Sequence, residues 1–162
     1  MTAAALLLRS QLGAALVVRG DELLVRNAYG DASVRYERAL LFDPESEAAV
    51  DRLTFVALQR RSTRALLEGV SVASRYLRNH EKSHTVLFDR GLCFLLLREY
   101  ARAFVDFRAA AAVTQNPQQY VFAGWAAKRS GRLREAIALW RAALSVRHRY
   151  RPAILALREL RL

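Results

Sequence analysis

Cysteine, glycine and proline are scarce in this chain of 162 residues, and each scarcity excludes a class of protein. A single cysteine, Cys93, cannot form a disulfide within the chain and cannot build a cysteine-rich zinc site. Seven glycines and three prolines are too few for an all-β protein, which needs a turn about every 8–12 residues. The sequence therefore favours a helical chain that is stabilised by its core alone.

Acidic residues are also in short supply, with 15 Asp and Glu against 26 Lys and Arg, for a net charge of +11. Lys82 and Lys128 are the only lysines, so nearly all of the positive charge is arginine. This balance excludes an acidic solvating protein and indicates an acidic partner or surface. Apolar residues make up 53% of the chain, which is enough for the core of one folded domain and excludes wholesale disorder.

The most apolar stretch, Met1–Val18, contains no unbroken apolar run of the length that crosses a membrane. Arg9, Ser10 and Gln11 interrupt it, and a spanning helix needs about 20 mostly apolar residues. No basic residue precedes the apolar run, so the stretch does not resemble a secretory signal peptide. We expect a packed helix without a transmembrane segment; the alternative is a hydrophobic anchor that docks on a partner or a membrane surface. The expected location is intracellular and cytoplasmic, or peripheral to a membrane or a large assembly.

Helical periodicity dominates the rest of the chain, and one pattern repeats. Apolar residues recur at the spacing of one helix face, and the breaks between such segments are short, which favours antiparallel helical neighbours. In three segments a glycine is followed by alanine, an aromatic residue and alanine at offsets of 12, 16 and 19. These sets are Gly20 with Ala32, Tyr36 and Ala39; Gly91 with Ala103, Phe107 and Ala110; and Gly124 with Ala136, Trp140 and Ala143.

Close packing of two helices explains this pattern. The glycine lets the second helix approach the first, and the aromatic residue between two alanines forms the complementary face. Each pair leaves apolar surface exposed unless neighbouring pairs stack on it, so the units are expected to form a solenoid. One further unit, near residues 48–78, departs from the pattern, with Thr54 in place of the glycine and Gly69 interrupting its second helix.

The chain resembles the tetratricopeptide repeat family at these residues. The segment RGDELLVRNAYGDASVRYERALLFDP carries the Gly, Ala, Tyr and closing Asp-Pro, and REYARAFVDFRAAAA and SGRLREAIALWRAAL resemble the second helix of the motif. The resemblance implies an all-α, right-handed superhelical solenoid of antiparallel helix pairs. We expect a single domain over 1–162, made of an N-terminal helical extension (1–12), repeats at 13–46, 47–83, 84–116 and 117–150, and a C-terminal capping helix (151–162).

The resemblance also implies that the first helices of the pairs line a concave groove. Helical phase predicts mostly apolar and aromatic residues on that face, which suits an apolar or amphipathic segment of a partner protein. The groove does not offer the Lys, Arg and Asn positions with which some family members hold an acidic peptide terminus. The predicted groove residues are Val17, Leu24, Phe55, Leu58, Phe88, Leu92, Leu95, Val121, Trp125 and Lys128, with Asp21 and Asp51 at the two remaining positions.

Arginines gather away from this face, on predicted second helices and turns. Uncompensated arginine attracts acidic protein or phosphate, so contact with RNA is an alternative. Tyr36, Phe107 and Trp140 are assigned to packing, which leaves few aromatic residues for stacking on bases. The predicted basic surface consists of Arg60, Arg61, Arg64, Arg132, Arg134, Arg147, Arg149 and Arg151.

No constellation of catalytic or metal-binding residues stands out. His80 and His84 flank Glu81 in a predicted turn without a second pair of ligands, and Cys93 lies among apolar residues. We therefore predict no enzyme activity, no cofactor and no metal. The predicted function is a scaffold or adaptor for protein partners. The alternatives are a secretion or assembly chaperone that shields an apolar segment, and a basic component of a ribonucleoprotein; apolar ends and an apolar groove also permit self-association.

Overall fold

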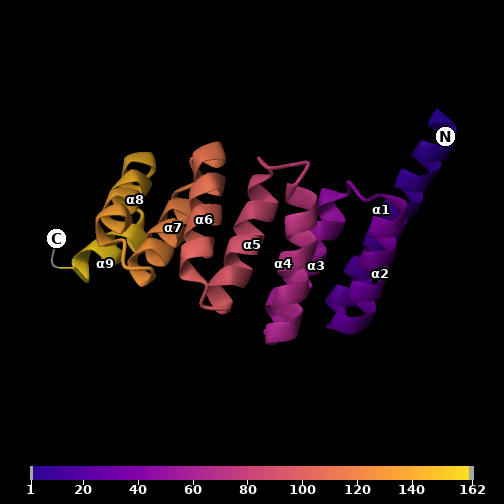
Figure 1. Ribbon diagram of the computed structural model, residues 1–162, viewed down its shortest axis with the longest axis horizontal. Helices are drawn as coiled ribbons and strands as arrows, with labels where there is room; N and C mark the ends of the chain where they lie inside the picture. The colour runs from indigo at the N-terminus through magenta and orange to yellow at the C-terminus, as the bar shows by residue number, and fades with distance from the viewer. Residues whose placement is uncertain (1, 161–162) are drawn as a thin grey trace. The chain divides into compact units, whose positions relative to one another are not determined.

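The computed structural model describes residues 2–160, and this part of the chain contains nine α-helices and no strand (Figure 1). The all-α prediction is confirmed. Contacts divide the chain into two compact units, Met1–Asn79 with α1–α4 and His80–Leu162 with α5–α9. The helices are α1 (Ala3–Val25), α2 (Tyr29–Phe42), α3 (Glu47–Arg60), α4 (Thr63–Leu77), α5 (His84–Leu96), α6 (Tyr100–Thr114), α7 (Pro117–Arg129), α8 (Leu133–Val146) and α9 (Arg151–Arg158).

Short polar side chains decide where several helices begin. The side-chain oxygens of Ser46, Ser62 and Ser83 each accept a hydrogen bond from a backbone N–H in the first turn of α3, α4 and α5. Asn116 does the same for α7, in which Pro117 takes the first helical position. The turn between α5 and α6 has an unusual sequence for a break between helices. It contains neither glycine nor proline, and a non-glycine residue, Arg98, adopts the left-handed conformation there with φ 62°.

An aromatic ring lies over a glycine in three helix pairs, as the sequence pattern predicted. A Cβ atom added to Gly91 would lie 2.7 Å from Cε1 of Phe107, and one added to Gly20 would lie 2.7 Å from Cζ of Tyr36. Gly124 is covered in the same way by the indole ring of Trp140. The three rings are completely buried, so they cannot move out into solvent to make room for an added methyl group on the glycine.

The second helix pair, α3 and α4, is built differently. Thr54 replaces the glycine, is fully buried, and donates its hydroxyl proton to the carbonyl oxygens of Val50 and Asp51 at 3.1 and 2.8 Å. The predicted interruption at Gly69 is wrong, because α4 is continuous from Thr63 to Leu77 and buries this glycine. This pair has its buried glycine, Gly69, on the second helix, whereas the other pairs have theirs on the first helix. The unit therefore does not match the repeat pattern of the other three.

A charged pair is buried between α5 and α6. Nε and Nη2 of Arg90 each lie 2.7 Å from a carboxylate oxygen of Asp106, in a two-pronged arrangement. The Asp106 side chain is 4% exposed and that of Arg90 is 20% exposed. Paired charges at this depth are tolerated because each satisfies the other, whereas one alone would be left without solvation.

The N-terminal extension is continuous with the first helix of the first pair. Residues 3–12 and 13–25 form one helix of 23 residues, α1, so the stretch is neither as short nor as broken as the sequence suggested. Within the described residues α1 is the one helix long and apolar enough to cross a membrane, judged by length and composition alone.

Replacing Gly91 by alanine is expected to destabilise the fold by about 1–3 kcal/mol, because the added methyl group overlaps the buried ring of Phe107. Thermal unfolding followed by circular dichroism measures the effect. Gly30 is the matched control: it lies in α2, and no atom lies within 4 Å of the place that a Cβ would occupy, so Gly30→Ala is expected to leave the melting temperature unchanged or raise it. Equal losses in both variants would contradict the packing role of Gly91.

Replacing Asp106 by alanine is expected to cost about 3–5 kcal/mol, because it leaves the Arg90 guanidinium partly buried without its carboxylate. The exposed pair of Arg64 and Glu68 serves as the control, and Glu68→Ala is expected to cost less than about 0.5 kcal/mol. Urea unfolding of both variants checks the difference. A cost for Asp106→Ala as small as that of the control would show that the buried pair contributes nothing.

Candidate functional site

Two predicted groove residues are buried in the core, and their assignment to the groove is wrong. Val17 is 8% exposed and Val121 is 2% exposed. Each lies three residues before a packing glycine, Gly20 or Gly124, and residues three apart share one face of a helix. The first predicted position of the groove therefore lies on the face that packs against the second helix. Phe88, three residues before Gly91, shares this placement and is half-buried against the ring of Phe107.

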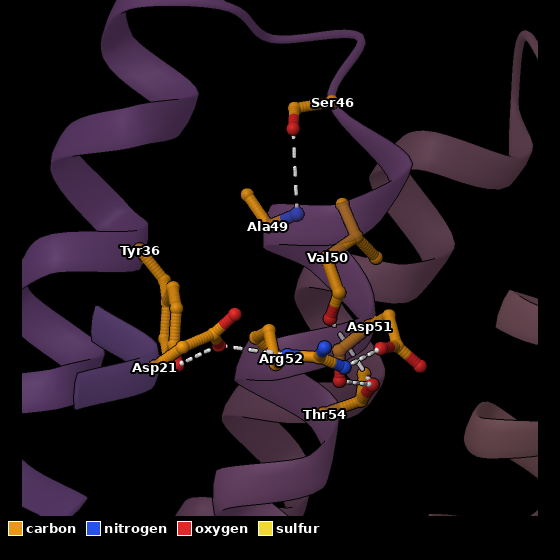
Figure 2. A network of polar contacts seen from close by, with 8 residues as sticks. All are labelled: Asp21, Tyr36, Ser46, Ala49, Val50, Asp51, Arg52 and Thr54. Carbon is orange, nitrogen blue, oxygen red and sulfur yellow. Dashed lines mark hydrogen bonds and ion pairs between the residues drawn. The ribbon is translucent and has the colours of Figure 1, made fainter. Parts of the chain in front are cut away.

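The other predicted groove positions of the first unit are accessible to solvent to different degrees. Phe55 of α3 is 42% exposed, while Leu24 and Leu58 are half-buried. Asp21 and Asp51, the two acidic positions, do not stand alone. They belong to a polar network that joins α1, α2 and α3 (Figure 2).

Figure 2 shows this network beside the first aromatic ring of the repeat pattern. The hydroxyl of Tyr36 donates to Oδ1 of Asp21 at 2.8 Å, and Nε of Arg52 donates to the same oxygen at 2.8 Å. Nη1 of Arg52 reaches Oδ2 of Asp51 at 2.6 Å. Burial, and then the hydrogen bond to Asp21, raise the pKa of Tyr36. Sequence reasoning missed Arg52, because the pairing joins helices that are far apart along the chain.

Four aromatic rings form a continuous cluster in the second unit. The ring centroids of Phe88 (α5), Phe107 (α6) and Phe122 (α7) lie 5.3–5.4 Å from one another. Trp125 meets the edge of Phe122 at 5.3 Å and 74°. Phe107 is fully buried, Phe88 and Phe122 are half-buried, and Trp125 is 40% exposed. The cluster thus runs from the core to the surface and ends in an indole ring that is open to solvent.

The structure brings two of the predicted residues, Phe88 and Trp125, into one site, and it adds Phe122. The sequence analysis missed Phe122 because it follows Val121 by one residue and the predicted phase selected Val121. Leu92 and Leu95 continue the helical stripe of Phe88 along α5 and are half-buried. Lys128, the predicted cation of this face, donates to Oε2 of Glu159 at 3.2 Å and so links α7 to the end of α9.

The eight arginines of the predicted basic surface are all exposed. Two of them pair with a neighbouring glutamate on the same helix end, Arg64 with Glu68 at 3.0 Å and Arg132 with Glu135 at 3.8 Å. Arg132 also lies over the ring of Phe104, with 5.0 Å between its Cζ and the ring centroid. These side chains are therefore accessible to a partner.

Several aromatic rings of the second unit carry guanidinium groups on their faces. Arg108 joins Arg132 over Phe104, Arg102 lies over Phe94, and the Cζ atoms of Arg108 and Arg102 are 5.2 and 5.6 Å from the ring centroids. Arg129 covers Tyr100 at 5.2 Å. Rings stacked in this way hold arginine in place through cation–π attraction, and they do not offer the open faces on which nucleobases stack.

No group of three or more His, Cys, Asp or Glu residues that could hold a metal ion occurs within residues 2–160. Cys93 is completely buried in α5. Burial, and to a lesser extent the charge of Asp89, raise the pKa of the Cys93 thiol to about 12. A thiol in this environment stays protonated at neutral pH and is a poor nucleophile.

Comparisons with known proteins identify the fold. No protein-family model and no curated protein matches the sequence. Solved structures do match: MamA, with 16% identity over 83% of this chain and 77% of that chain, and YrrB, described as a TPR protein with an unusual peptide-binding site, with 17% identity over 90% and 74%. A tetratricopeptide repeat protein from Parabacteroides merdae ATCC 43184 matches with 18% identity over 90% of this chain and 57% of that chain. The TM-score is 0.74 in each case, so the chain has the tetratricopeptide repeat fold.

Cys93 is expected to resist thiol reagents in the folded protein at about pH 8, because its raised pKa leaves almost no thiolate and burial blocks access. Colorimetric thiol titration measures the rate before and after denaturation. The variant Val146→Cys places a thiol at a position that is 46% exposed in α8 and is the control for a reactive site. Rapid modification of Cys93 in the native chain, at a rate near that of the control, would contradict its burial.

Proposed function

We propose that this protein is a non-catalytic protein-interaction module that binds an apolar or amphipathic segment of a partner protein. The binding face is formed by α5 and α7 of the second unit, with Phe88, Leu92, Phe122 and Trp125 as its principal residues. The tetratricopeptide repeat fold supports an interaction role in general. The identity of this particular face rests on the aromatic cluster.

The exposed indole of Trp125 is the observation that carries the proposal. A large aromatic side chain that is 40% exposed leaves apolar area in water, which favours its coverage by a partner. Its base is fixed by the edge contact with Phe122, so it loses little side-chain freedom on binding. Rigid aromatic anchors surrounded by apolar residues are typical of the positions that dominate binding energy in interfaces.

The form of the ligand follows from the spacing of the face. Phe88, Leu92 and Leu95 present one stripe along α5, and the ring of Phe122 connects it to Trp125 on α7. An amphipathic helix offers apolar side chains at matching intervals along one face. Among proteins of the same fold, YrrB is described as having an unusual peptide-binding site, which is in keeping with recognition of a peptide segment.

The net charge of +11 supports an acidic partner. Exposed arginines such as Arg134, Arg149 and Arg151 attract negative charge over the distance of a Debye length, about 8–10 Å at physiological salt. Such attraction raises the rate of association and orients the partner more than it increases final affinity. In this proposal the arginines speed and orient association with the partner, and the aromatic cluster provides most of the binding energy.

Trp125→Ala is expected to weaken partner binding at least tenfold while leaving the fold intact, because the ring is an anchor of the interface and lies at the surface. Affinity capture from extract at low and high salt, with and without nuclease, is quantified by mass spectrometry for the wild type, Trp125→Ala and the control Leu133→Ala. Leu133 is 45% exposed on α8 and lies outside the cluster. A protein retained at high salt by the wild type and the control, and lost with Trp125→Ala, is the expected result.

Two results would overturn the proposal. The first is retention of every captured protein by Trp125→Ala at the level of the control. The second is loss of all captured material with high salt or nuclease, which would assign function to the arginine surface and to RNA.

A further inference from the structure

The first turns of α1 extend past the helix on which the rest of α1 packs. The hydroxyl of Ser10 donates to Oδ2 of Asp43 at 3.2 Å, and Nη2 of Arg9 donates to the carbonyl oxygen of Leu41 at 3.1 Å. Asp43 is the residue at which α2 ends. The part of α1 before Arg9 therefore has no helix beside it within the described residues of the first unit, and Figure 1 shows this end of α1 projecting beyond α2.

This projecting segment, Ala3–Leu8, is apolar on all sides. Its sequence is three alanines followed by Leu6, Leu7 and Leu8, and the leucines are 52%, 63% and 58% exposed. Successive residues of a helix point about 100° apart, so the three leucines cover most of the circumference. A helix packed on one partner helix needs one apolar stripe, whereas a helix surrounded by lipid is apolar all round. The pattern therefore favours a lipid environment over a protein partner on one side.

Apolar side chains of α2 lie at the same end of the helix pair. Leu41, whose carbonyl oxygen binds Arg9, is 72% exposed, and the next residue, Phe42, is 38% exposed. Leu12 of α1, one residue before Gly13, which packs against Asp43 at the end of α2, is 44% exposed. Exposed apolar side chains of both helices therefore lie at this end of the pair. Patches of this kind on a folded protein mark an interaction surface.

The charge of this region has the sign that an anionic bilayer attracts. Residues 1–20 contain no Asp or Glu, and their two charged residues are Arg9 and Arg19. Arg9 directly follows the projecting segment, at the level where the headgroups would lie if the leucines entered the hydrocarbon. The net charge of the chain, +11, adds a long-range attraction to negative lipid.

We propose that Ala3–Leu8 inserts into the surface of a bilayer that contains anionic lipid, with Arg9 among the headgroups, and so attaches the protein peripherally to a membrane. Six residues of helix are about 9 Å long at 1.5 Å per residue, far less than the hydrocarbon core of about 30 Å, so the segment enters one leaflet without spanning the bilayer. The insertion is limited to this segment. Gly13 and Gly20 seat the remainder of α1 against α2, and a Cβ atom on Gly13 would lie 3.1 Å from Cβ of Asp43.

Vesicle flotation with the full chain tests the proposal. The probes are vesicles of phosphatidylcholine alone and of phosphatidylcholine with phosphatidylglycerol. The wild type is expected to float with the anionic vesicles at least tenfold more than the double variant Leu7→Gln, Leu8→Gln, and more than with the neutral vesicles. The matched control, Leu67→Gln with Leu155→Gln, changes two leucines that are 50% and 54% exposed elsewhere and is expected to float within twofold of the wild type.

A fluorescent label measures insertion directly. Because Cys93 is buried, a cysteine introduced as Leu7→Cys is the site that an environment-sensitive maleimide dye labels in the folded protein. The expected result is a blue shift of the dye on addition of anionic vesicles and quenching by lipids brominated in the acyl chain. A label on Leu67→Cys is expected to show neither effect.

The proposal is overturned if the wild type does not float, if the control variant loses flotation as much as the Leu7 and Leu8 variant, or if the dye at position 7 is not quenched. Sedimentation velocity distinguishes the competing occupant: a wild-type oligomer that Leu7→Gln, Leu8→Gln converts to a monomer, without any vesicle binding, assigns the segment to a second copy of the chain. Flotation of Trp125→Ala at the wild-type level keeps this inference separate from the proposed binding face.

Discussion

The close approach of an aromatic ring to a glycine is the contact on which three helix pairs of this protein depend. In three pairs a completely buried ring fills the space that a methyl group on the glycine would occupy. The missing side chain on one helix therefore makes room for an aromatic side chain of the other. Because the ring of Phe107 is also held between Phe88 and Phe122, the same contact sets the position of the aromatic cluster that reaches the surface at Trp125.

This packing determines which large apolar side chains remain exposed at the surface. The rings that lie over glycines are buried in the core, and other rings, such as Phe104 and Tyr100, have an arginine guanidinium stacked on them. Trp125 is neither buried nor covered in these ways, which is why it is the candidate anchor for a partner. The first turns of α1 form a second candidate surface, because α1 extends beyond the end of α2 and Leu6, Leu7 and Leu8 are exposed to solvent there. Taken together, the two proposals describe a protein that joins a partner protein to a membrane.

The sequence was sufficient to predict the contacts that repeat from one helix pair to the next, and insufficient for contacts that occur once. The spacing of Gly, Ala and aromatic residues predicted the helix pairs and their contacts, because each contact recurs at one offset. It did not reveal the pairing of Arg90 with Asp106 or of Arg52 with Asp21. Arg90 and Asp106 are 16 residues apart, the offset of glycine and ring, but the residues before the glycine and the ring carry opposite charges in this pair and not in the other two. Arg52 and Asp21 belong to different helix pairs, 31 residues apart. The groove prediction failed at Val17 and Val121, which lie three residues before a packing glycine and share its face. The role of Gly69 was misjudged because the second pair places its glycine on the other helix.

A double-mutant cycle on Gly91 and Phe107 tests the central contact most directly. Urea unfolding of Gly91→Ala, Phe107→Leu and the double variant gives the energy by which the two sites interact. If the glycine exists to admit the ring, the smaller leucine relieves the overlap with the added methyl group. The double variant is then expected to be more stable than the sum of the single losses by about 1 kcal/mol or more. Losses that simply add would contradict the claim that ring and glycine are fitted to each other.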